Sequence, residues 1–186
     1  MNFMQLRERQ PKFPVTVKTG EGVVELIWNK IEYADGYRVF ASPVGKNHFV
    51  GVINVKGTTA VMKKRANGVP MQYKVKAFRI ADGPDNFFGE SEIVIACPLE
   101  TPRRLTAIVG SDGICTLSWR YNSQCDGFKI YADSNESGKY SFVCYSGKNS
   151  CRLDSFTKSG KVSFVVRSFI MTGHMDCLLY TSPSPR

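Results

Sequence analysis

The sequence predicts an all-β protein made of two tandem antiparallel β-sandwiches. In short runs, apolar residues alternate with polar ones, which puts every second side chain on one face of a half-buried strand. The sequence also repeats itself, because VVELIWNKIEYADGYRVFAS at 23–42 matches ICTLSWRYNSQCDGFKIYAD at 114–133 with a constant offset of 91 residues. No amphipathic helical pattern competes with these runs. Several short strands joined by turns in each copy indicate a sandwich.

The strands of the first copy are separated by the turn-forming stretches 18–22 and 66–70. A last strand is expected within NFFGESEIVIACP at 86–98, where the alternation returns. The residues expected to face inward on the earlier strands are Val24, Leu26 and Trp28, then Tyr37, Val39 and Ala41, then Tyr73, Val75 and Ala77.

The second copy follows the same plan at the same offset. YKVKAFRI from Tyr73 aligns with FVVRSFIM from Phe164 without a gap. Turns are expected at 111–113 and 158–160. The residues expected to face inward are Cys115, Leu117 and Trp119, then Phe164, Val166 and Ser168.

The pattern of a tryptophan, a loop ending in ADGYRVF and the run YKVKAF resembles the fibronectin type III domain, an immunoglobulin-like fold. The residues of the first copy that fit are Trp28, Ala34, Gly36, Tyr37, Val39, Tyr73, Val75 and Ala77; Trp119, Gly127, Phe128, Ile130, Phe164 and Val166 fit more loosely in the second. The resemblance covers 11–176 and implies two seven-stranded sandwiches in tandem. The Arg-Gly-Asp tripeptide of some family members is absent, so integrin-type binding is not supported.

The domain boundaries that we predict are an N-terminal arm at 1–10, a first domain at 11–98, a linker at 99–103, a second domain at 104–176 and a tail at 177–186. Phe164 stands where the family has a tyrosine in this strand. Losing the hydroxyl removes a hydrogen bond worth about 0.5–1.5 kcal/mol, so we expect the second domain to be the less stable one.

The tail CLLYTSPSPR, Cys177 to Arg186, resembles the translation of a transposase adapter used in shotgun sequencing libraries. On this interpretation the sequence is a truncated metagenomic fragment: Asp176 is its last native residue, and the native protein is expected to continue beyond it. The second sandwich would then lack its native last strand and leave an open sheet edge. A native Ser-Pro tail is the alternative.

The net charge of +9 is spread over both halves of the sequence. The only dense basic runs are Lys63-Lys64-Arg65 and Arg103-Arg104, which we interpret as solvated loops, with phosphate binding as the alternative. We therefore expect no nucleic-acid partner. No apolar run is long enough to cross a membrane, so no membrane insertion is expected in this segment. The start has no apolar secretion signal, so either the protein is not exported or the true start is missing.

The native-looking cysteines predict no metal site, because no C-x-x-C pair is present and the sequence has only two histidines. They are Cys97, Cys115, Cys125, Cys144 and Cys151. Cys144 and Cys151 flank the turn YSGKNS and occupy the places of Ile53 and Ala60, so the offset puts them across two strands from each other. Spacing does not decide whether they form a disulfide.

No catalytic, cofactor-binding or metal-binding residue and no cofactor is predicted. His48 and His174 both lie in predicted loops, and no serine lies in a nucleophile-elbow motif. Asn135-Glu136-Ser137 matches the glycosylation sequon, which matters only in a glycosylating secretory pathway. If a ligand binds, loops at the ends of the sandwiches are the expected place. The surface residues chosen for mutation are Asn47, His48, Phe49, Lys63, Lys64 and Arg65.

The function expected is that of a non-catalytic binding or spacer module, a monomer within a larger bacterial surface or secreted protein. Its ligand would be a protein or a glycan, and its location extracellular or at the cell surface. The resemblance supplies this expectation, since similar tandems accompany carbohydrate-active or adhesion domains. One alternative is a structural module of a phage tail, assembled in the cytoplasm as part of a virion, and an enzyme is the third class.

Overall fold

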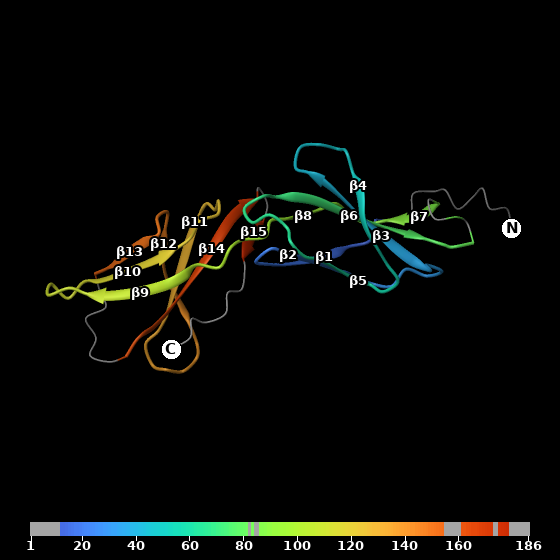
Figure 1. Cartoon of the computed structure of the whole chain (residues 1–186). Coiled ribbons are helices and arrows are strands. Elements are labelled where there is room, and N and C mark those ends of the chain that lie inside the picture. The colour runs from blue at the N-terminus through green and yellow to red at the C-terminus, as the bar shows by residue number, and fades with distance from the viewer. Residues whose placement is uncertain (1–11, 82, 84–85, 155–160, 173–174, 179–186) are drawn as a thin grey trace. The chain divides into compact units, whose positions relative to one another are not determined.

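The computed structural model describes residues 12–81, 83, 86–154, 161–172 and 175–178 (Figure 1). Throughout these residues the regular elements are β-strands, as the alternating patterns predict. The strands form two compact units, one from most of the residues before Pro98 and one mainly from the residues after it. None of the described residues belongs to a helix long and apolar enough to span a membrane.

The first unit is a sandwich of two sheets. One sheet has the strand order β1-β2-β5, and the other has the order β4-β3-β6-β7, with β8 pairing with the opposite end of β6. The strands are β1 (Val15–Gly20), β2 (Val23–Trp28), β3 (Gly36–Pro43), β4 (Val50–Val55), β5 (Thr59–Met62), β6 (Met71–Phe78), β7 (Phe87–Glu90) and β8 (Val94–Ala96).

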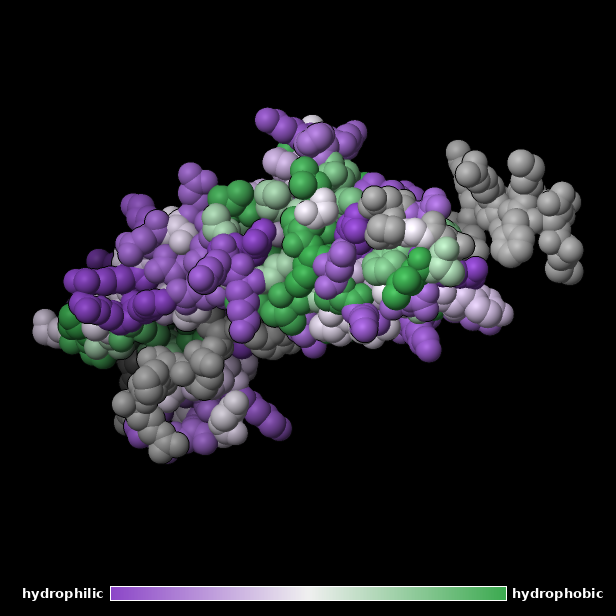
Figure 2. Space-filling model, turned by 45° about the vertical axis from the view of Figure 1, so that its right-hand side comes forward, coloured by the Kyte–Doolittle hydropathy of each residue, from purple (hydrophilic) through white to green (hydrophobic). Residues whose placement is uncertain are grey.

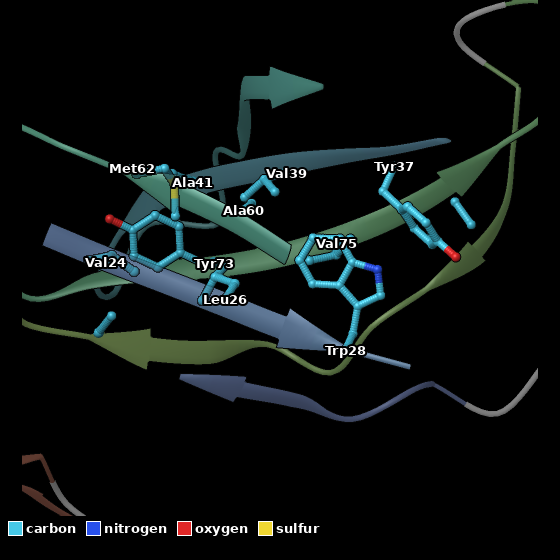
Figure 3. Packing of buried hydrophobic residues seen from close by; sticks show 12 residues of the cluster. Val24, Leu26, Trp28, Tyr37, Val39, Ala41, Ala60, Met62, Tyr73 and Val75 are labelled. Carbon is cyan, nitrogen blue, oxygen red and sulfur yellow. The ribbon is translucent and has the colours of Figure 1, made fainter. Parts of the chain in front are cut away.

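The core of the first unit lies between these sheets (Figure 3). Every residue predicted to face inward on β2, β3 and β6 is buried. The indole of Trp28 meets the ring of Tyr37 edge to face, with 5.3 Å between ring centroids. The alternation predicts these faces correctly because a half-buried strand exposes and buries its side chains by turns.

The last strand predicted within 86–98 is divided in two. Ser91 interrupts it, and its backbone N–H donates to Val75 O at 2.8 Å while its hydroxyl accepts the Val75 N–H at 2.8 Å. Because Ser91 turns both groups toward one residue of β6, the ladder is broken there. β7 and β8 therefore pair with the two ends of β6 separately.

The second unit repeats this arrangement. One sheet has the order β13-β10-β9 and the other β12-β11-β14-β15. The strands are β9 (Arg103–Val109), β10 (Cys115–Arg120), β11 (Gly127–Asp133), β12 (Ser141–Ser146), β13 (Ser150–Leu153), β14 (Ser163–Thr172) and β15 (Met175–Leu178). The core includes Leu117, Trp119, Phe128, Ile130 and Val166. Cys115 and Ser168 are buried as predicted, and Phe164 is half-buried against the core.

The edge of β14 differs from the open edge that we expected. β15 pairs with it antiparallel, with Phe169 opposite Leu178 and Thr172 opposite Met175. The expectation of an open edge is therefore wrong for residues 169–172, because an extended segment satisfies the unpaired backbone groups of an edge strand. No counterpart of β8 pairs with the other end of β14 within the described part of the chain. The predicted arm at 1–10, the turn at 158–160 and the tail beyond Leu178 lie outside the described residues.

Arg103 and Arg104 begin strand β9, so their assignment to a loop is wrong, although both are exposed. Strand pairing overrides the weak local pattern here, because Arg103 lies opposite Arg120 of β10.

The sequence pattern assigns the expected loss of stability in the second unit to Phe164, the counterpart of Tyr73, but the tyrosine hydroxyl that makes a hydrogen bond in the first unit is that of Tyr37. Tyr73 Oη is buried and has no hydrogen-bond partner. Burial is the main cause that raises the pKa of Tyr73, and the nearby Arg65 opposes it. Tyr37 Oη, in contrast, accepts the Ile31 N–H at 2.8 Å. The substitution that removes a used hydroxyl in the second copy is therefore Phe128 for Tyr37, not Phe164 for Tyr73.

Candidate binding surface

The loop residues singled out from the sequence lie in two loops of the first unit. Asn47 and His48 are exposed in the loop between β3 and β4, and Lys63 and Lys64 are exposed after β5. His174 lies outside the described residues. Within the described chain, no group of three or more His, Cys, Asp or Glu residues is placed to hold a metal ion.

The sequon Asn135-Glu136-Ser137 lies in an exposed loop after β11 that Asp133 organises. Asp133 Oδ1 accepts the backbone N–H groups of Asn135 and Ser137 at 3.1 and 3.2 Å, and Oδ2 accepts that of Gly138 at 2.6 Å. Burial acts to raise the pKa of Asp133, but these donors outweigh it and hold the pKa below its ordinary value. Each oxygen of the carboxylate thus has a hydrogen-bond donor within the loop, and these donors explain the lowered pKa without a ligand.

A different surface stands out on the outer side of the β4-β3-β6-β7 sheet. Here cationic and aromatic side chains alternate on the face that points away from the core. We call it the first cation–aromatic face: Arg38, Phe40, Lys74, Lys76, Phe78 and Phe87, with Phe49 and Glu90 at its border.

The cations of this face lie over the rings. Lys76 Nζ lies 5.6 Å from the ring centroid of Phe40 and 5.5 Å from that of Phe87, and Arg38 Cζ lies 5.4 Å from the latter. Lys74 Nζ lies 4.4 Å from the centre of the Phe49 ring. Each contact has the geometry of a cation–π interaction, which attracts the cation to the ring face.

Glu90 adds one negative charge beside two lysines of this face. Its oxygens lie 3.3 Å from Lys74 Nζ and 3.1 Å from Lys76 Nζ. Burial acts to raise the pKa of Glu90, but hydrogen bonding and charge from Lys76 and Lys74 together lower it. With Arg38 included, the face keeps a net positive charge.

The second unit carries the same kind of surface on the β12-β11-β14-β15 sheet. We call it the second cation–aromatic face: Lys129, Tyr131, Phe142, Tyr145, Arg167 and Phe169. Lys129 Nζ lies 5.6 Å from the centroid of Tyr145 and 5.4 Å from that of Phe169. Arg167 Cζ lies 4.9 Å from that of Tyr131.

The two faces correspond at four positions at the offset of 91, whereas Lys74 of the first face has the buried Val165 as its counterpart. Arg38 matches Lys129, Phe40 matches Tyr131, Lys76 matches Arg167 and Phe78 matches Phe169. The strand pairing agrees, because Arg38 lies opposite Lys76 as Lys129 lies opposite Arg167. Sequence reasoning looked for sites in loops and missed these residues. The sequence signal that could have predicted them is the recurrence of cationic and aromatic residues at outward positions of equivalent strands in both copies.

The repeated Asp-Gly pair supports each face from one end. A Cβ on Gly36 would lie 2.6 Å from the ring of Phe78, and one on Gly127 would lie 3.1 Å from the ring of Phe169. Asp35 accepts the Ile80 N–H at 2.9 Å, and Asp126 accepts the Met171 N–H at 2.6 Å. The glycine thus leaves room for an aromatic ring, and the aspartate fixes the strand that carries this ring.

Large hydrophobic side chains also reach the surface of both units. Figure 2 shows hydrophobic areas, in green, among hydrophilic ones on the side that it displays. On the second face Phe142 is 48% exposed and Tyr145 is 61% exposed. Exposed aromatic side chains beside cations are typical of protein interaction surfaces.

Comparisons with known proteins return structural matches only. No family model and no curated protein matches the sequence. A two-domain fibronectin type III segment of chicken tenascin matches 90% of this chain and 97% of its own, at 16% identity and a TM-score of 0.43. The FN1–FN3 domains of chicken CNTN1 match 91% of this chain and 66% of their own, at 19% identity and a TM-score of 0.39.

A β-1,2-glucanase from Parabacteroides distasonis matches half of this chain, 50%, at 20% identity and a TM-score of 0.43. This chain spans 13% of the glucanase's length. In the second unit a three-stranded sheet packs on a four-stranded one, and in the first unit β8 is added to the larger sheet; two packed antiparallel sheets are the architecture of immunoglobulin-like sandwiches. Each unit is a fibronectin type III-like β-sandwich.

Proposed function

We propose that the chain is a non-catalytic binding module that holds an acidic protein partner on its cation–aromatic faces, within a larger bacterial surface or secreted protein. One observation carries this proposal: two cations and two aromatic rings recur at equivalent positions on the outer side of the corresponding sheet in both units, with Lys129 of the second unit only 7% exposed between its rings. Outward positions of a sheet are free to change when they only meet water, so their repetition favours a shared use.

A protein partner fits these faces better than a glycan does. Aromatic residues and arginine are enriched where proteins meet, and they carry a large part of the binding energy. Sugars stack on open ring faces, whereas the rings of Phe40 and Phe87 already have Lys76 above them. The cations favour a partner with acidic groups, because complementary charge steers association and excludes partners of like charge.

The test compares three forms of the chain. The first is the wild type, the second combines Arg38→Ala and Arg167→Ala, and the third combines Lys63→Ala and Lys64→Ala as a charge-matched loop control. Proteins of a bacterial extract that are cross-linked to the wild type would be identified, purified and titrated against all three. We expect the face variant to bind at least about 30-fold more weakly, as loss of a hot-spot residue does, and the loop control to bind like the wild type.

Equal losses in the face variant and the loop control would show that only net charge matters, which contradicts the proposal. A parallel titration uses uronate-containing oligosaccharides. If these bind and no protein of the extract does, the ligand is a glycan and the proposal of a protein partner is wrong.

A further inference from the structure

The thiols of Cys144 and Cys151 face each other across the second unit. Their sulfur atoms lie 3.1 Å apart, and both side chains are half-buried. Cys144 belongs to β12 and Cys151 to β13, which lie in different sheets of the sandwich. A covalent bond here would therefore join the two sheets.

The surrounding strands fix this approach. Cys144 lies opposite Ile130 of β11, and Cys151 lies opposite Leu117 of β10. Residues directly opposite each other on antiparallel strands point to the same side, and Ile130 and Leu117 are fully buried. Both cysteines thus point into the sandwich, and each packs against its core.

The intervening turn is held by hydrogen bonds of its own. Ser146 Oγ donates to Ser150 O at 2.6 Å and accepts the Lys148 N–H at 3.1 Å. A short turn closed in this way limits how far the two cysteines separate.

The first unit shows that the fold does not need thiols at these places. Ile53 lies opposite Val39, and Ala60 lies opposite Leu26, at the offset of 91 from the two cysteines. Ala60 is buried and Ile53 is half-buried. Two aliphatic side chains thus serve the same packing role, so the facing thiols of the second unit call for an additional explanation.

We propose that Cys144 and Cys151 are an oxidation site that forms an intersheet disulfide when the chain meets an oxidising thiol–disulfide pool. This inference is independent of the proposed binding function, because neither cysteine belongs to a cation–aromatic face. The bond would close the second sandwich at the edge where β12 and β13 meet, and it fits a protein that works outside a reducing cytoplasm.

The chemistry balances with oxidised glutathione as the oxidant. The thiolate of one cysteine attacks the disulfide, forms a mixed disulfide and releases one glutathione, which takes up a proton. The thiolate of the second cysteine then attacks the mixed disulfide and releases the second glutathione. The cysteine pair loses two electrons and the glutathione disulfide gains them.

Burial, and then the neighbouring Cys144 thiol, raises the pKa of Cys151. Only the thiolate attacks a disulfide, so we expect the oxidation rate to rise with pH from neutral to alkaline conditions.

The experiment maps the bond in the full chain. The protein is incubated with oxidised glutathione at about pH 8, its remaining thiols are alkylated in denaturant, and it is digested with trypsin. Trypsin cuts after Lys148, so the bond would join the peptides YSFVCYSGK and NSCR. We expect this linked pair, and a loss of two of the six titratable thiols.

Two results would overturn the proposal. One is alkylation of all six thiols after oxidation. The other is a link from NSCR to LTAIVGSDGICTLSWR, which carries the buried Cys115 of the neighbouring strand β10.

A matched variant, Cys144→Ile with Cys151→Ala, copies the residues of the first unit. Oxidation should raise the melting temperature of the wild-type second unit by at least about 4 °C, and should leave that of the variant unchanged. An equal shift in both proteins would assign the stabilisation to other thiols and contradict the proposal.

Discussion

Gly127 occupies a position where the backbone leaves no room for a side chain. A Cβ there would lie 2.9 Å from the backbone oxygen of Ser146 and 3.1 Å from the ring of Phe169. Backbone atoms cannot turn aside as a long side chain does, so Gly127→Ala should lower the free energy of unfolding of the second unit by about 1–3 kcal/mol. Urea denaturation measures this value. Gly147→Ala is the matched control because nothing lies within 4 Å of its Cβ position; equal effects of both changes would show that steric overlap is not the cause.

Two tyrosines of the first core separate the effect of a used hydroxyl from that of an unused one. Tyr37 Oη accepts the Ile31 N–H, whereas Tyr73 Oη is buried without a hydrogen-bond partner. Tyr37→Phe should therefore lower the free energy of unfolding by about 1 kcal/mol, and Tyr73→Phe should be neutral or slightly stabilising. Guanidinium denaturation of both variants checks the order, and a larger loss in Tyr73→Phe would contradict it.

At the scale of the elements, the first cation–aromatic face links β6 to β7 through Glu90. The pKa of Glu90 is lowered in the folded state because Lys76 and Lys74 outweigh the effect of burial. A carboxyl group with a lowered folded pKa stabilises above its unfolded pKa, and this contribution is lost as the pH falls through the folded pKa. We therefore expect the melting temperature of the first unit to fall more steeply below about pH 4 in the wild type than in Glu90→Gln. If the melting temperatures of the wild type and Glu90→Gln fall in parallel with pH, Glu90 does not cause the loss of stability in acid.

The strands also show what a sequence can and cannot predict. The inward faces of β2, β3 and β6 are predicted because alternation is a local property that burial enforces. The division between β7 and β8 depends on the pairing of Ser91 with Val75, and β15 depends on the free edge of β14; both are tertiary effects without a local pattern. The outward faces are not predicted from charge runs or loops, because these are local features of the sequence, whereas a face gathers residues from several strands.

At the scale of the whole chain, the repeat has produced two cores, and among the described residues these cores share none. Leu26 is fully buried in the first and Leu117 in the second, at equivalent places of β2 and β10. Leu26→Ala should lower the free energy of unfolding of the first unit by about 2–5 kcal/mol, through lost burial and the cavity left behind. Its effect on amide exchange should be confined to β1–β8, and that of Leu117→Ala to β9–β15. Loss of protection in both units after either change would show that they unfold as one cooperative body.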